Sequence, residues 1–260
     1  MTQTERRIFL IKELLSESGK ISRISPEKLS SADQKNLLRS LMNVRMPAPA
    51  SDEFLKIQNE YLTIALDEKG ITDLSDLTPV QDDFYIWQGD ITTLRCGAIV
   101  NAANSRLLGC FQPLHNCIDN CIHTYSGIQL RNKCHEIMQR QGHEEPTGKA
   151  KITPAYNLPC EYVIHTVGPI VNNFLTEEHC KLLESCYLSC LETAQKNDIK
   201  SIAFCCISTG VFGFPQKEAA EIAVKTVKKF KAETGSGIKV IFNVFKDEDR
   251  EIYEKLFGKN

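Results

Sequence analysis

The sequence predicts an α/β fold, in which helices cover both faces of a mostly parallel sheet, preceded by a helical N-terminal extension. Three observations lead to this prediction. Short apolar runs are rich in β-branched and aromatic residues, as buried strands are. Long stretches with helical periodicity separate most of them, and this alternation is typical of the class. The 260 residues are 42% apolar and 25% charged, so the chain can bury a substantial core.

Residues 1–75 are expected to form the N-terminal extension. Helical patterns cover three segments of it, residues 7–19, 31–42 and 51–67. Ser30 or Ser31 can cap the second helix, and the prolines of residues 46–51 indicate a linker before the third. Because these helices carry no catalytic pattern, we interpret them as a packing element.

Residues 76–260 are expected to form the domain that holds the sheet, with the junction at about residues 75–85. The predicted strands are residues 84–87, 98–100, 162–167, 201–207 and 239–245. The predicted helices are residues 118–141, 176–196, 216–233 and 247–257.

Charge and hydropathy exclude several classes of protein. The 31 basic and 33 acidic residues give a formal net charge of −2, so no nucleic-acid or anionic-membrane partner is expected. No apolar run approaches the ~20 residues of a membrane-spanning helix, and the N-terminus lacks the features of a signal peptide. Without an export signal, the eleven cysteines are expected to be reduced thiols of a cytoplasmic protein.

Unusual polar residues follow three of the predicted strands. QGDI (88–91) follows the first strand, NAANS (101–105) the second, and STGVFGFP (208–215) the fourth. In parallel sheets, ligands bind at the loops beyond the carboxyl ends of the strands. The third loop has two glycines, two hydroxyls and a helix behind it, so its backbone N–H groups can converge on a phosphate. By itself, however, such a loop is weak evidence, and an ordinary turn is the favoured interpretation.

Five motifs in a fixed order carry a specific resemblance. They are QGDIT, AIVNAANSRLLG, IDNCIH, YVIHTVGP and STGVFGFP, spread over about 130 residues. Together they closely resemble the macrodomain family, which binds ADP-ribose. The resemblance covers residues 82–257 and implies a three-layer α-β-α fold with a mostly parallel central sheet. The N-terminal helices lie outside it.

The resemblance implies roles for individual residues. Asp90 matches the aspartate that accepts a hydrogen bond from the adenine amino group, and Ile91 matches its neighbour, whose backbone also meets the adenine. Asn104 matches the asparagine that contacts the distal ribose, and Asp119 matches the acidic residue of the hydrolase branch. The other residues expected to bind ADP-ribose are Cys117, Ile118, Ser208, Thr209, Gly210, Val211 and Phe212.

The segment before Asp119 departs from the common family pattern. Where other members carry a glycine run, this chain reads GCFQPLHNCIDN (109–120). Cys110, His115 and Cys117 supply two thiols and one imidazole, a donor set that suits tetrahedral zinc. Since this matches the zinc-containing bacterial branch, we expect one Zn²⁺ per chain on these three residues. The alternative is a chance cluster in a cysteine-rich chain.

Four nearby residues are not expected to bind this metal. Cys121 is a rival ligand, but it lies inside the following helix, on a face that should pack on the sheet. His123 and His135 lie on the same predicted helix, and we interpret them as non-ligands. His165 lies in an apolar strand and is interpreted as a hydrogen-bonded core histidine.

Three protein ligands leave one position open, as in catalytic zinc sites. A zinc ion near Asp119 could polarise a ribose hydroxyl or an ester oxygen, or hold a water. We hypothesise that Asn104 and Asp119 are catalytic: Asn104 positions the ribose, and Asp119 orients or deprotonates the attacking water. Alternatively, zinc only folds the loop, and Asp119 only complements the helix dipole.

The resemblance also implies a reaction and its partners. Mono-ADP-ribose on an Asp or Glu side chain of a modified protein would be hydrolysed, releasing ADP-ribose. The zinc-containing branch further implies a lipoyl-carrier protein as substrate, modified by a sirtuin-type ADP-ribosyltransferase. Three other functions stay open: a non-catalytic ADP-ribose-binding module, a hydrolase of a small derivative such as O-acetyl-ADP-ribose, and a redox sensor that uses Cys110 and Cys117.

Overall fold

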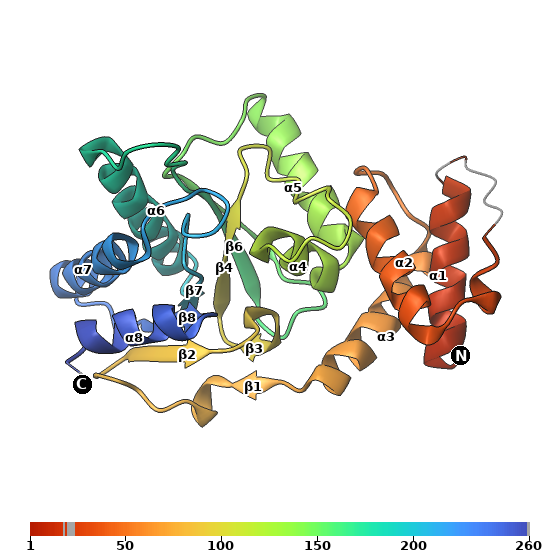
Figure 1. The fold of residues 1–260 in the computed structure, drawn as a ribbon, viewed down its shortest axis with the longest axis horizontal. Helices are drawn as coiled ribbons and strands as arrows, with labels where there is room; N and C mark the ends of the chain where they lie inside the picture. Colours follow the sequence, from red (N-terminus) through yellow and green to blue (C-terminus); the bar gives the residue numbers. More distant parts are fainter. Residues whose placement is uncertain (18, 20–23, 259–260) are drawn as a thin grey trace.

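A six-stranded sheet forms the centre of the protein in a computed structural model, which describes residues 1–17, 19 and 24–258 (Figure 1). In sheet order, its strands are β2 (Phe84–Gln88), β8 (Lys239–Val244), β7 (Ser201–Phe204), β4 (Ala98–Ala103), β6 (Tyr162–Val167) and β5 (Ala150–Pro154). All neighbours are parallel except β5, which pairs antiparallel with β6 at one edge. Two short strands, β1 (Thr72–Asp73) and β3 (Leu94–Arg95), form a separate parallel pair.

Helices cover both faces of this sheet, as the sequence predicts. Figure 1 shows α6 (Glu177–Lys196), α7 (Gln216–Thr234) and α8 (Asp247–Leu256) on one side, and α4 (Ile118–Ser126) and α5 (Ile128–Gln141) on the other. Three single-turn 3₁₀ helices connect other elements: η1 (Pro26–Lys28), η2 (Leu74–Asp76) and η3 (Ile91–Thr93). The central strands are apolar without alternation because both of their faces are buried, as at Ala98, Ile99 and Val100.

Three helices form an N-terminal bundle: α1 (Gln3–Glu17), α2 (Ser31–Val44) and α3 (Asp52–Lys69). The bundle has its own apolar cluster, and it packs outside α4 and α5 (Figure 1). Ser30 and Ser51 cap α2 and α3 by accepting hydrogen bonds from backbone N–H groups, which confirms Ser30 as the cap of the second helix. The helix predicted over residues 7–19 includes Ser18, which lies outside the described residues.

Several predicted boundaries are wrong, for identifiable reasons. The single helix predicted over residues 118–141 is two helices, because Gly127 adopts a φ of +94° between them. The strand predicted over 201–207 ends at Phe204, although the apolar run continues into a buried loop. The strand β5 was not predicted, since its sequence AKITP lacks a strong apolar pattern.

The separation into residues 1–75 and 76–260 stays a prediction. Within the described part of the chain, no helix combines the length and the apolar character needed to cross a membrane.

Candidate functional site at the carboxyl edge of the sheet

Four adjacent parallel strands bring the polar loops of the sequence together. The strands β2, β8, β7 and β4 are neighbours in this order, so their carboxyl ends meet at the same edge of the sheet. The loops that follow them hold most of the residues predicted to bind ligand or metal. This edge is therefore where the structure gathers the candidate site.

Asp90 is fixed in place directly after β2. It caps η3, and its Oδ1 accepts hydrogen bonds from the backbone N–H of Thr92 (3.0 Å) and from the Thr92 hydroxyl (2.6 Å). Its Oδ2 lies 2.9 Å from Nζ of Lys69, at the end of α3. Burial opposes ionisation, but the Thr92 hydroxyl and Lys69 together bring the pKa of Asp90 below its usual value. The carboxylate is thus ionised and oriented, and Ile91 beside it is buried.

The loop after β7 is a tight turn with left-handed residues and internal backbone hydrogen bonds. Ser208 and Gly213 adopt left-handed φ angles of +66° and +67°, and the N–H of Phe214 donates to the carbonyl of Ser208 (3.0 Å). Among the described residues, the buried hydroxyl of Ser208 has no hydrogen-bond partner. Val211, by contrast, is 80% exposed. α7 begins at Gln216, directly after this loop, so a helix N-terminus follows it in the chain.

Asn104 and Asp119, the two residues hypothesised to be catalytic, lie close together. Nδ2 of Asn104 lies 3.4 Å from Oδ2 of Asp119 and donates to the carbonyl of Gly109 (3.1 Å). The Oδ1 atom of Asn104 accepts from the N–H of Arg106 (3.0 Å). The Asn104 amide therefore organises the loop that follows β4, and it also reaches the acid.

Asp119 lies in the first turn of α4, and buried polar side chains surround its carboxyl group. It is only 5% exposed. Its Oδ1 accepts from Nδ2 of Asn101 (2.8 Å) and lies 3.6 Å from Nε2 of His123. Burial raises the pKa of Asp119 to about 6, although Asn101 and the charge of Arg131 act in the opposite direction. A carboxyl with such a pKa can accept a proton near neutral pH.

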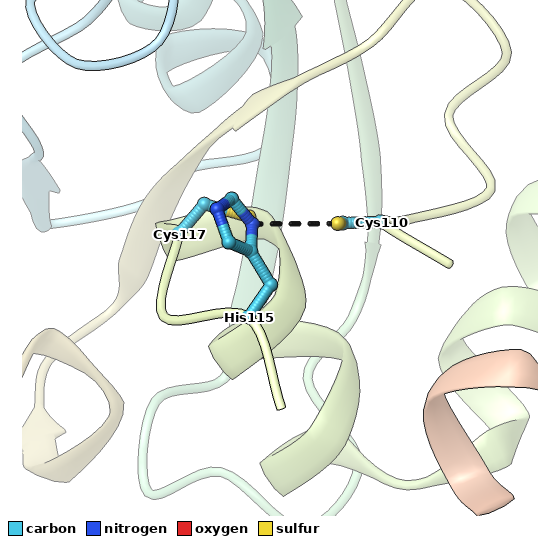
Figure 2. Close-up of side chains that lie close together, drawn as sticks. All are labelled: Cys110, His115 and Cys117. Atoms are coloured by element: carbon cyan, nitrogen blue, oxygen red, sulfur yellow. Dashed lines mark hydrogen bonds between the residues drawn. The ribbon is translucent and has the colours of Figure 1, made fainter. Parts of the chain in front are cut away.

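Cys110, His115 and Cys117 converge at the start of α4, as Figure 2 shows. The Sγ of Cys110 lies 3.5 Å from Nδ1 of His115, and the three donor atoms lie within 4.8 Å of one another. Cys117 is the N-cap of α4, and its Sγ accepts from the N–H of Asn120 (3.4 Å). Burial raises the pKa of the Cys117 thiol to about 12 in the absence of a metal.

The donor set fits zinc. With Zn–S bonds of about 2.3 Å and Zn–N bonds of about 2.0 Å, a tetrahedral ion separates its sulfur and nitrogen ligands by roughly 3.5 Å. This is the spacing between Cys110 and His115. All three side chains are only partly buried, which leaves access for an ion and for a further ligand.

One prediction about the neighbouring residues is wrong. Cys121 does not pack on the sheet; its half-buried sulfur faces the N-terminal bundle, 3.9 Å from Nη2 of Arg39. The reason is that α4 lies between the sheet and the bundle, so both of its sides are covered. His165 is a hydrogen-bonded core histidine, as predicted, between Asn101 (3.1 Å) and Thr153 (2.9 Å).

His123, which we predict not to bind metal, has an unusual environment. It lies close to Cys134 and His165 in a buried group of possible metal donors. Within the described part of the chain, neither of its ring nitrogens forms a hydrogen bond. Because Asn101 and Thr153 already occupy both nitrogens of His165, we retain the interpretation of this group as core.

Sequence reasoning missed several residues that build the site. Asn101 begins the NAAN motif, but its role as the donor to Asp119 appears only once β4 extends through it. Lys69 and Arg39 come from the N-terminal bundle and give no local signal. Phe245 follows β8 at the same edge and is 81% exposed. An aromatic residue at the end of an apolar strand is a signal that could have identified it.

Taken together, these features define an α/β protein with a ligand site at the carboxyl edge of its sheet, combining a glycine loop, a buried acid and a Cys–His–Cys group. The chain belongs to the Macro domain family, whose profile matches residues 100–223. A protein-ADP-ribose hydrolase of Treponema medium is 59% identical over 263 residues, covering 99% of this chain and all of that protein. A protein-ADP-ribose hydrolase of Staphylococcus aureus (strain MSSA476) is 53% identical over 230 residues, covering 88% of this chain and 86% of that protein. Among solved structures, the Trypanosoma brucei macrodomain in complex with ADP-ribose matches with a TM-score of 0.66 and 30% identity, covering 84% of this chain and 94% of that one.

Proposed function

We propose that this protein is a hydrolase that removes mono-ADP-ribose from Asp or Glu side chains of a modified protein, with one zinc ion bound by Cys110, His115 and Cys117. The observation that carries the proposal is the position of Asp119. This buried acid lies two residues beyond Cys117, one of the three possible metal donors, and within reach of Asn104, at the edge where four strand ends meet.

The general part of the proposal has direct support. The relatives from Treponema medium and Staphylococcus aureus are named protein-ADP-ribose hydrolases, and they align over nearly the whole of this chain. The similar Trypanosoma brucei structure contains ADP-ribose. These findings support an enzyme that acts on ADP-ribosylated protein. Zinc dependence and the acidic acceptor are the finer part of our proposal.

The two ends of the site suit the two ends of ADP-ribose. At one end, the ionised Asp90 accepts the adenine amino group, Ile91 offers its backbone, and the exposed ring of Phe245 offers a flat apolar surface for the base. In the middle, the N–H groups of the loop Ser208–Phe212 bind the pyrophosphate and the distal ribose. The loop needs no charged side chain for this role, because backbone donors and a helix N-terminus supply the positive potential.

Asp119 and Asn104 act at the distal ribose, together with the neighbouring Cys117 and Ile118. Asn104 positions the ribose, and Asp119 accepts a proton from the attacking water. Hydrolysis adds one water across the ester, giving ADP-ribose with a free anomeric hydroxyl and the free carboxylic acid of the acceptor. Asn101 holds Asp119 in the required orientation through Nδ2.

The metal would be held by Cys110, His115 and Cys117. When bound, zinc supplies Lewis acidity for a ribose hydroxyl or ester oxygen. By resemblance to the zinc-containing branch, the substrate is a lipoyl-carrier protein modified by a sirtuin-type ADP-ribosyltransferase. The cytoplasmic location proposed for the protein rests on the cysteine-rich sequence without an export signal.

Release of ADP-ribose from a protein mono-ADP-ribosylated on Asp or Glu tests the proposal. We expect turnover by the wild type, and a loss of 100-fold or more for Asp119→Asn with bound zinc retained. Cys117→Ser should lose both zinc and turnover. Cys180→Ser, which changes a half-buried thiol on α6, is the matched control and should keep both.

Other outcomes would replace the proposal by one of its alternatives. ADP-ribose binding without turnover by the wild type would leave a binding module. Faster turnover of O-acetyl-ADP-ribose than of modified protein would indicate a small-molecule hydrolase. Reversible inactivation by peroxide with zinc release would indicate a redox sensor, although the raised pKa of Cys117 disfavours a reactive thiolate.

A further inference from the structure

Two polar side chains of the N-terminal bundle contact the segment that carries the metal ligands. Nη2 of Arg39 donates to the backbone carbonyl of His115 (2.8 Å) and to Oδ1 of Asn120 (3.1 Å). One helical turn further along α2, Oδ1 of Asn43 accepts from the backbone N–H of Leu114 (3.0 Å). The bundle therefore holds both the ligand His115 and the residue before it.

Asn120 connects these contacts to the two cysteines. Its Nδ2 donates to the carbonyls of Cys110 (3.2 Å) and Gln112 (2.9 Å), and its backbone N–H donates to Sγ of Cys117 (3.4 Å). Its side chain is fully buried, so these hydrogen bonds do not compete with water. The guanidinium of Arg39 is therefore coupled to His115 directly and to Cys110 and Cys117 through Asn120.

The segment also needs an external hold. Leu114 adopts a φ of +58°, in the left-handed region that non-glycine residues avoid. Leu114 is 38% exposed, so burial of its side chain compensates for this conformation only in part. Asn43 can stabilise it because it binds the N–H of Leu114 and, through Nδ2, also donates to Thr124 of α4 (2.9 Å).

From this network we infer that Arg39 and Asn43 are positioning residues of the metal site, and that the N-terminal bundle forms its outer wall. The inference rests on the zinc site of the proposed function and deepens it. It assigns the bundle a role in the site itself: the bundle presets the spacing of Cys110, His115 and Cys117, so that the ion binds a formed site rather than a loop that must first be ordered.

Zinc affinity tests this inference without reference to activity. We would measure the zinc dissociation constant of the full chain by competition with a chromogenic chelator. Arg39→Met should weaken zinc binding by roughly 10-fold or more, as is usual for residues that orient ligands. Arg39→Lys keeps one donor for the His115 carbonyl, so its zinc affinity should lie between those of the wild type and Arg39→Met. Asn43→Ala should also weaken zinc binding.

Arg6→Met is the matched control. Arg6 is a half-buried arginine of the same bundle, and its side chain binds Glu60 of α3 (2.9 Å) instead of the segment that carries the proposed ligands. This variant should keep the zinc affinity of the wild type. In the metal-free protein, the amide of Leu114 should exchange with deuterium faster in Asn43→Ala and Arg39→Met than in Arg6→Met.

The outcomes separate the inference from the proposed function. If the wild type binds zinc and Arg39→Met binds it equally tightly, the positioning role is wrong and the zinc site stands. If Arg6→Met weakens zinc binding as much as Arg39→Met, the effect is general destabilisation of the bundle, and the inference also fails. If the wild type binds no zinc, the proposed metal site is overturned and the inference falls with it.

Discussion

Lys69, the last residue of α3, forms an ion pair with Asp90, 2.9 Å from Nζ to Oδ2. The same ammonium lies 3.4 Å from the centroid of the Tyr125 ring on α4. Because Thr92 occupies Oδ1 of Asp90, Lys69 is the group that orients Oδ2, the atom that we propose accepts a hydrogen bond from the adenine amino group. The N-terminal bundle thus contacts both ends of the proposed site, Asp90 through Lys69 and the Cys–His–Cys segment through Arg39.

Lys69→Met should weaken ADP-ribose binding by roughly 3- to 10-fold, because Asp90 loses its orienting partner. The hypoxanthine analogue of ADP-ribose lacks the exocyclic amino group, so its affinity should hardly change in the variant. Isothermal titration calorimetry with both ligands measures the two affinities in the wild type and in the variant. Lys228→Met removes a lysine that lies over Phe257 and serves as the control. Equal losses for the two ligands would contradict the assigned role.

Arg131 of α5 links the bundle to the rest of the protein. It is buried, and it donates to the carbonyls of Leu108 (2.7 Å), Met42 (3.0 Å) and Arg45 (2.6 Å). Arg131→Met leaves these carbonyls without a donor and should lower the free energy of unfolding by about 3–5 kcal/mol. Urea denaturation gives the value, and the exposed Arg140→Met should change it little. A loss below about 1 kcal/mol would mean that water replaces the guanidinium.

His165 should make the protein less stable in acid. Burial lowers its pKa from 6.5 to about 3, so between these values the unfolded chain binds a proton that the native protein does not. The contribution of His165 to the free energy of unfolding is therefore fully present above pH 6.5. It falls as the pH decreases below this value, by roughly 1 kcal/mol per pH unit. Urea unfolding at pH 7, 6 and 5 should show a shallower loss for His165→Gln than for the wild type. Asp119, with its raised pKa, has the opposite effect, but it contributes equally to both proteins and cancels in the difference.

Cys110 and Cys121 should differ in metal binding. Cys110→Ser should bind less than about a tenth as much zinc as the wild type after dialysis, because a hydroxyl is a poor zinc ligand. Cys121→Ser should retain the metal, since the sulfur of Cys121 faces Arg39 instead of the other donors. Mass spectrometry of the zinc content of each variant distinguishes the two cysteines. Loss of zinc from Cys121→Ser alone would make Cys121 the ligand and Cys110 a bystander.

The candidate site was predictable wherever its residues are close in sequence. Cys110, His115 and Cys117 lie within eight positions, and the loop at 208–212 follows one strand, so their grouping could be seen without a structure. The partners of these residues could not. Asn101 binds Asp119 across 18 positions, and Arg39 binds His115 across 76. Such contacts depend on how helices pack, which local patterns do not encode.

The sequence by itself determined the fold class and the chemistry of the strand-end loops, because periodicity and short-range spacing are local properties that survive in any arrangement of the chain. The tertiary structure alone decided three things: the break at Gly127, the exposure of Cys121 to the N-terminal bundle, and the contacts of Lys69 and Arg39 with the two ends of the site. The physical reason is burial. Because α4 is covered on both sides, polar groups such as Asn120 and Thr124 are shielded from water, and the bundle supplies partners for them.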